Sequence, residues 1–240
     1  STPASVHAFV TGAASGIGAA LVEALRCKGA IVWAADLDPL IGDTWGGRDD
    51  VVPLQLDVGD PAEVEDAIQS IADTTGHLDL VINNAGILTA GPFESISHDQ
   101  WRRAVDVNLW GVVNGTRSAY EVMQQQGYGH IVNVASSAGV LPVAGSVPYA
   151  TTKHAVVGLS SSLRAEAQRS RSGVKVSVVL PGLVETAVYA NAETSGGYDY
   201  AAAMEKVPFR KITPRQAADE ILRGVAANRA GVPGGARCLV

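Results

Sequence analysis

Short runs of apolar, β-branched residues alternate along the chain with segments of helical periodicity. The apolar runs predict strands at residues 6–10, 30–36, 51–57, 78–84, 130–136 and 174–182. The helical segments are 16–28, 61–76, 98–126 and 147–170. The strands are continuously apolar rather than alternating, which is typical of a sheet covered by helices on both faces.

This alternation of strand and helix predicts right-handed crossovers and therefore one parallel sheet. We expect an α/β fold, a doubly wound parallel sheet of the Rossmann type, in a single domain spanning residues 1–240. Residues 43–50 are rich in glycine and aspartate and predict a loop. The tail at 230–240 is compatible with a short last strand, although Pro233 and two glycines disfavour one.

Composition and charge exclude several classes of function. The 240 residues carry a formal net charge of −6 and no Lys/Arg run, which argues against a nucleic-acid partner. Cys27 and Cys238 lack a CxxC partner, and the five histidines lack ligand spacing, so we expect neither disulfides nor a metal. With no signal-peptide pattern and no apolar run long enough to span a bilayer, we expect a cytoplasmic protein.

A glycine-rich turn, TGAASGIG at 11–18, follows the first predicted strand and opens the first helix. Gly12, Gly16 and Gly18 allow a tight turn and let a pyrophosphate approach the helix N-terminus. Glycines also serve plain turns, but the order of strand, turn and helix favours dinucleotide binding.

Asp36 ends the second predicted strand, 20 positions after Gly16. A carboxylate there accepts hydrogen bonds from an adenosine ribose and repels a 2′-phosphate. Neither Leu37 nor Ser15 offers a positive charge to such a phosphate, so the sequence favours NAD over NADP. The alternative is a solvated aspartate at a strand end.

Polar and turn-forming residues also follow the other strands, at the edge where open parallel sheets bind ligands. They are Asp57-Val58, Asn83–Gly86, Ser136 and the run 181–186. Tyr149 and Lys153, four residues apart, share one face of the helix predicted at 147–170.

Taken together, these motifs resemble the short-chain dehydrogenase/reductase family over about residues 6–186. The matching segments are TGAASGIG, Asp57-Val58, NNAG at 83–86, VNLWG around Asn108, SSAG from Ser136, YATTK at 149–153 and PGLVET at 181–186. The resemblance implies an NAD-dependent oxidoreductase that interconverts a secondary alcohol and a ketone by hydride transfer.

The resemblance also implies roles for individual residues. Tyr149 would be the general acid/base, Lys153 would lower its pKa and hold the nicotinamide ribose, Ser136 would bind the substrate oxygen, and Asn108 would hold a relay water. The residues implied at the cofactor are Gly12, Ser15, Gly16, Ile17, Gly18, Asp36, Leu37, Asp57, Val58, Asn84, Ala85, Gly86, Tyr149, Lys153, Pro181, Gly182, Val184 and Thr186.

Simple electrostatics supports the pairing of Tyr149 with Lys153. A catalytic tyrosine needs a pKa about three units below its ordinary value near 10, which costs about 4 kcal/mol. One ammonium at roughly 5 Å supplies about 3 kcal/mol at an effective dielectric constant of about 20.

Substrate choice is expected to depend on residues 138–148 and 187–210, the second of which we interpret as a lid. A lipophilic pocket is suggested by Ser136, Ala138, Leu141, Val143, Tyr149, Val188 and Tyr189. Packing between lid and body explains the apolar members equally well.

We expect a small-molecule alcohol or ketone as substrate and a homodimer or homotetramer as the assembly. The alternative function is an NAD(H)-binding sensor or scaffold, which the intact Asn108, Ser136, Tyr149 and Lys153 disfavour.

Overall fold

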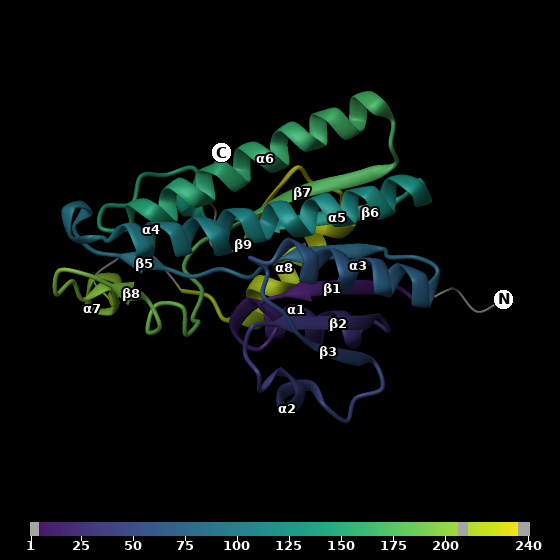
Figure 1. Ribbon diagram of the computed structural model, residues 1–240, viewed down its shortest axis with the longest axis horizontal. Coiled ribbons are helices and arrows are strands. Elements are labelled where there is room, and N and C mark those ends of the chain that lie inside the picture. The colour runs from purple at the N-terminus through teal and green to yellow at the C-terminus, as the bar shows by residue number, and fades with distance from the viewer. Residues whose placement is uncertain (1–4, 206–210, 235–240) are drawn as a thin grey trace.

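A seven-stranded parallel sheet forms the centre of the computed structural model, which describes residues 5–205 and 211–234 (Figure 1). Its strand order is β3-β2-β1-β4-β6-β7-β9, so the direction of winding reverses between β1 and β4. The strands are β1 (His7–Thr11), β2 (Ile31–Asp36), β3 (Val51–Gln55), β4 (Leu80–Asn83), β6 (Gly129–Val134), β7 (Val174–Pro181) and β9 (Gly231–Gly234).

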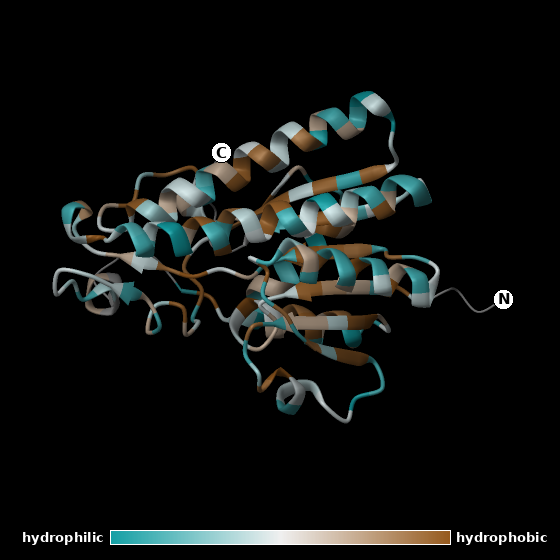
Figure 2. Cartoon of the chain, in the orientation of Figure 1, coloured by the Kyte–Doolittle hydropathy of each residue, from teal (hydrophilic) through white to brown (hydrophobic). Residues whose placement is uncertain are grey.

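Helices cover both faces of the sheet, as the continuously apolar strands predict. On one face, α1 (Gly16–Arg26) and α8 (Pro214–Ala226) bury Leu21 and Ile221 in a core that includes Val10. On the other lie α3 (Pro61–Thr75), α5 (Gly111–Gln126) and α6 (Val147–Ser170). Figure 2 shows hydrophobic strands between helices whose outer sides are hydrophilic. The doubly wound α/β fold expected from the sequence is therefore confirmed.

Local sequence signals fix several helix ends. The Asp60 side chain accepts hydrogen bonds from the backbone N–H groups of Ala62 and Glu63 at the start of α3, and Gly76 ends that helix with φ +79°. Thr213 forms a capping box with Gln216 at the start of α8. The sequence analysis had not predicted α8, although these capping signals were present in the sequence.

Three segments differ from the sequence-based expectation. Residues 98–126 form α4 (His98–Val105), a π-helical turn η2 (Asp106–Trp110) and α5 rather than one regular helix. A short helix α2 (Ile41–Trp45) precedes the glycine-rich loop at 46–50. β9 forms despite Pro233, because it pairs only with β7 at the sheet edge, where a strand tolerates a missing N–H donor.

Smaller elements extend the carboxyl edge of the sheet. A two-stranded parallel pair joins β5 (Thr89–Ala90) to β8 (Glu193–Thr194), and α7 (Tyr200–Glu205) follows it. The 3-10 turns are η1 (Phe93–Ser95) and η3 (Ser137–Gly139). Residues 206–210 of the expected lid, and Cys238 in the tail, lie outside the described residues. Within those residues, no helix combines the length and hydrophobicity that crossing a membrane requires.

Candidate active site

The glycine-rich turn between β1 and α1 has a backbone that only glycine fits. Gly12 and Gly16 have φ values of +67° and +57°. A Cβ on Gly18 would lie 1.9 Å from the Gly12 carbonyl oxygen. At the N-cap of α1, the exposed Ser15 makes no side-chain capping bond. The turn therefore presents the helix N-terminus in the form that binds a pyrophosphate.

Contacts from two distant elements hold this turn in place. Asn84 Nδ2 donates to the carbonyl oxygens of Thr11 (3.0 Å) and Gly12 (3.2 Å). Trp45 Nε1 donates to the Ala13 carbonyl oxygen at 2.9 Å from the end of α2. The sequence analysis missed Trp45, because no local pattern links it to a turn 32 residues away.

Asp36 lies at the end of β2 beside the same turn. Its Oδ2 accepts a hydrogen bond from the Ala14 N–H at 2.9 Å, and its Oδ1 accepts one from the Asp38 N–H at 3.0 Å. Each carboxylate oxygen keeps a further lone pair, so Asp36 remains able to accept bonds from a ribose.

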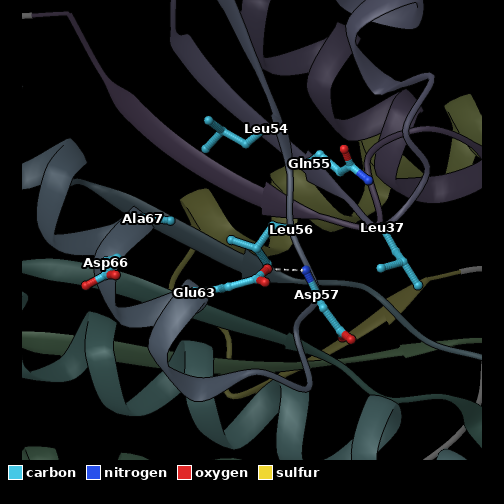
Figure 3. A pocket seen from close by; sticks show the side chains of 8 residues that line it. All are labelled: Leu37, Leu54, Gln55, Leu56, Asp57, Glu63, Asp66 and Ala67. Carbon is cyan, nitrogen blue, oxygen red and sulfur yellow. Dashed lines mark hydrogen bonds between the residues drawn. The ribbon is translucent and has the colours of Figure 1, made fainter.

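An open hollow of about 510 Å³ lies next to Asp36 along the sheet edge (Figure 3). Leu37 and Asp57 lie at its rim with Glu63, whose Oε2 accepts a hydrogen bond from the Asp57 N–H at 2.9 Å. Asp66 adds a further carboxylate. The hollow therefore has the place expected for the adenosine end of a dinucleotide, with acidic side chains around it.

Ser136 and Tyr149 are brought together at the ends of β6 and α6. Ser136 follows β6 and its Oγ accepts a hydrogen bond from the Ala138 N–H at 3.1 Å. Its side chain also interacts with the Tyr149 hydroxyl, and this interaction lowers the pKa of the phenol. Burial opposes this and raises the pKa of Tyr149 to about 12, with smaller contributions from Tyr189 and Tyr200.

Lys153 lies one helical turn beyond Tyr149 on the same face of α6. Its Nζ donates to the Val134 carbonyl oxygen at 2.9 Å and lies 5.6 Å from the centroid of the Tyr149 ring. Burial lowers the pKa of Lys153 to about 8. The distance agrees with the expected pairing, whereas desolvation of the phenol acts against the expected lowering of the Tyr149 pKa.

Asn108 lies fully buried in the π-helical turn η2. Its Oδ1 accepts from the Ile87 N–H at 2.8 Å, and its Nδ2 donates to the Ile87 carbonyl oxygen at 2.9 Å. A Cβ on Gly86 would lie 3.2 Å from Asn108 Oδ1 and 3.4 Å from Lys153 Nζ. Because Gly86 has no side chain, a small space remains between Asn108 and Lys153. Wide helical turns of this kind are frequent at functional sites.

Thr152 connects two of these residues and was missed by the sequence analysis. Its buried hydroxyl donates to the Tyr149 carbonyl oxygen at 2.8 Å and accepts from Asn108 Nδ2 at 3.3 Å. The position before Lys153 in YATTK was visible, but its burial against η2 was not.

The segment after β7 lies against the glycine-rich turn. Gly182 follows the buried Pro181, and Val184 packs with Ile17 of α1. A Cβ on Gly16 would lie 3.2 Å from Thr186 Cγ2. Residues 182–186 therefore lie beside the start of α1, as their expected role at the cofactor requires.

At the other side of the site, the Val58 carbonyl oxygen accepts a hydrogen bond from Asn114 Nδ2 at 2.9 Å. The N–H groups of Asn84 and Ala85 donate to Thr11 Oγ1.

The expected pocket residues divide into two groups. Val188 and Tyr189 pack with Tyr149 in one apolar cluster. Ala138 is buried near Ser136, whereas Leu141 is 52% exposed and Val143 is half-buried outside that cluster. A feature that sequence reasoning missed is Tyr200, a buried member of the same cluster.

Comparison with known proteins identifies the family of this chain. A sequence model of the family described as short chain dehydrogenase matches residues 6–196. Human 15-hydroxyprostaglandin dehydrogenase [NAD(+)] is 34% identical over 196 residues, covering 78% of this chain and 71% of the relative. The oxidoreductase SadH of Mycobacterium tuberculosis is 35% identical over 234 residues, covering 94% and 84%.

Solved structures give the same result. A short-chain dehydrogenase/reductase from Burkholderia phymatum, in complex with NAD, has a TM-score of 0.86 at 26% identity, covering 96% of this chain and 89% of that one. The chain belongs to the short-chain dehydrogenase/reductase family, and it is an oxidoreductase that acts on a CH–OH group.

Proposed function

We propose that this protein is an NAD-dependent dehydrogenase or ketoreductase that interconverts a lipophilic secondary alcohol and its ketone. The observation that carries the proposal is the approach of the Ser136 side chain to the Tyr149 hydroxyl, with Lys153 Nζ 5.6 Å from the centroid of the Tyr149 ring. Two hydroxyls that meet at the ligand edge of the sheet can hold one substrate oxygen between them. The apolar cluster around Tyr149 supports a lipophilic substrate.

The preference for NAD is supported by the charges beside the glycine-rich turn. Asp36 ends β2, and Asp57, Glu63 and Asp66 line the adjacent hollow. These carboxylates would repel a 2′-phosphate, and the lining residues of the hollow include no lysine or arginine to offset them. The name of the human relative states NAD(+) as its cofactor, and the similar bacterial structure contains NAD.

In the proposed reaction, each residue has one task at the substrate oxygen. Bound NAD supplies the acceptor for the hydride that leaves the carbinol carbon. Tyr149 takes the hydroxyl proton during oxidation and returns it during reduction, while Ser136 keeps a hydrogen bond to the same oxygen. Lys153 places a positive charge near the tyrosinate. The hydrogen bond between Asn108 and Thr152 holds η2 against the start of α6, and Thr152 also bonds to the Tyr149 carbonyl oxygen.

The desolvation of Tyr149, which is partly buried, sets a requirement on this reaction. A pKa of about 12 leaves the phenol protonated at neutral pH, so it serves at once as an acid in reduction. Acting as a base in oxidation requires further positive charge. A second unit charge about 5 Å away supplies about 3 kcal/mol, or about two pKa units, and oxidised nicotinamide carries such a charge.

The test is NADH formation from NAD with a panel of secondary alcohols, using wild-type and Tyr149→Phe protein, with NADP in parallel. Loss of the acid/base hydroxyl should lower kcat by at least about 100-fold and leave the NADH dissociation constant within about threefold. Tyr128→Phe, at an exposed tyrosine before β6, is the matched control and should retain full activity. Retained turnover in Tyr149→Phe would overturn the proposed role. Tight NADH binding without turnover of any alcohol would favour the sensor or scaffold alternative.

A further inference from the structure

Three tyrosines of the segment 187–205 gather beside Tyr149, and we name Tyr189, Tyr198 and Tyr200 the tyrosine cluster. The ring centroids of Tyr189 and Tyr200 lie 6.4 Å apart with their planes at 24°. Those of Tyr198 and Tyr200 lie 6.2 Å apart at 50°. Tyr149 packs against the same apolar group, whose buried members are Leu88, Ala90 and Tyr200.

This segment is fastened to the body of the protein at several points. β8 pairs with β5 (Figure 1). Ser195 Oγ donates to Gln100 Oε1 at 2.8 Å, and Arg103 forms an ion pair with Glu193. The tyrosine cluster is therefore held at a defined position relative to Tyr149, which a residue that selects substrates requires.

A hollow of about 380 Å³ opens among these rings. Its volume falls within the range of small-molecule sites. The tyrosine cluster, Ala190, Ala192, Thr194, Gly197 and Asp199 line it. Asp199 is the one charged side chain among these lining residues, so the lining offers no positive charge to a carboxylate or a phosphate.

We propose that Tyr189 and Tyr200 form an aromatic binding wall, and that the substrate is an uncharged secondary alcohol or ketone with an aromatic ring attached to the reacting carbon. This inference rests on the proposed function. A substrate oxygen bound at Ser136 and Tyr149 brings its neighbouring ring to the apolar group that Tyr149 shares with the tyrosine cluster. Aromatic pairs gain about 0.5–1.5 kcal/mol beyond the area that they bury, whereas a saturated ring of equal size gains only the burial.

The experiment compares kcat/KM for 1-phenylethanol and 1-cyclohexylethanol, which have the same carbon skeleton. The wild type should prefer the phenyl compound by about 2- to 12-fold. In Tyr189→Leu and Tyr200→Leu this ratio should fall toward one, and Tyr200→Phe, which keeps the ring, should retain it. Tyr128→Leu is the matched control and should leave both values unchanged. Equal kcat/KM values in the wild type, or an unchanged ratio in both leucine variants, would overturn the proposal.

A binding measurement separates this inference from the proposed reaction. Acetophenone and cyclohexyl methyl ketone cannot react with NAD in its oxidised form, so calorimetry gives their dissociation constants from the NAD-loaded protein without turnover. Acetophenone should bind more tightly by about the same factor, and Tyr200→Leu should abolish the difference. Equal constants in the wild type would overturn the binding wall. A phenyl preference in binding without oxidation of either alcohol would support the wall and overturn the proposed reaction.

Discussion

At the scale of single residues, burial sets the protonation of the groups that matter most. Tyr149 has its pKa raised to about 12 and Lys153 has its pKa lowered to about 8, both chiefly by desolvation. Both shifts favour the uncharged form, so an ionised pair at this site depends on charges that a ligand brings.

Asp36→Asn tests the charge at the cofactor edge. The amide oxygen can still accept hydrogen bonds from the Ala14 N–H, but the repulsion of a 2′-phosphate is lost. Because one unit charge at about 4 Å contributes about 1–4 kcal/mol, the ratio of kcat/KM for NAD to that for NADP should fall at least about fivefold. Asp38→Asn, at the exposed neighbouring aspartate, should leave the ratio unchanged. A wild type that prefers NADP would contradict the role given to Asp36.

His130→Gln tests a buried histidine at the start of β6. Burial first, then Lys175 and Arg164, lowers its pKa from 6.5 to about 4, and its Nε2 bonds to Ser177 Oγ at 2.9 Å. The unfolded chain therefore binds this proton more tightly than the folded chain. The stability that His130 contributes is present above pH 6.5 and is lost as the pH falls toward 4.

Between pH 7 and pH 5 this histidine accounts for a loss of about 2 kcal/mol in the free energy of unfolding. Urea unfolding at the two pH values should show a smaller loss in His130→Gln by about that amount. His154→Gln, at an exposed histidine, is the control. The same pH dependence in wild type and His130→Gln would show that another group is responsible.

At the scale of elements, close packing of helices on strands places the site. α5 lies against β4 where Gly115 faces Asn83, and a Cβ there would lie 2.0 Å from Asn83 Oδ1. Asn83 Nδ2 donates to Asn133 Oδ1 of β6 at 2.9 Å, and Asn133 Nδ2 donates to Ser160 Oγ of α6 at 3.0 Å. These buried bonds tie α6, which carries Tyr149 and Lys153, to β6 and through it to β4.

Gly115→Ala should therefore push α5 away from β4. We expect a loss of about 1–3 kcal/mol in the free energy of unfolding, measured by urea denaturation. The same substitution at Gly158 in α6 is a matched control, because a Cβ there meets nothing within 4 Å. Gly158→Ala should stabilise the protein by about 0.5–1 kcal/mol. Equal effects at the two positions would refute the close approach of α5 and β4.

At the scale of the whole molecule, large apolar side chains remain on the surface. Trp110 of η2 is 52% exposed and Phe93 of η1 is 64% exposed. The homodimer or homotetramer expected from the family resemblance stays a prediction, and Trp110 is the residue at which we test it.

Sedimentation velocity should therefore give a mass of two or four times 24.8 kDa at micromolar concentration. Trp110→Arg should shift the distribution toward the single chain, because a charge replaces an apolar contact. Arg102→Ala, at an exposed arginine of α4, is the comparison variant. A single species of one chain mass at every concentration would rule out the assembly.

Much of the fold was predictable because its signals are local. Runs of apolar residues predicted six strands. The bounds of α6 agree with the helix predicted at 147–170. The π-helical turn η2 around Asn108 was not predictable, because one extra residue in a single helical turn changes the spacing of apolar residues too little to be recognised. β9 was doubtful because Pro233 is acceptable only at an edge, and the place of a strand in the sheet is a tertiary property.

The sequence by itself determined the order of strands and helices, the glycine-rich turn, and the presence of Ser136, Tyr149, Lys153 and Asn108 in family spacing. The first two follow from local backbone preferences and from periodicity, and the last from the resemblance of the motifs to the family. Only the tertiary structure decided that Trp45 supports the turn and that Tyr200 lies beside Tyr149. Only it decided that desolvation raises the Tyr149 pKa. Contacts of this kind join residues that lie far apart in the chain. They form, and the residues become buried, only when the sheet brings the carboxyl ends of its strands together.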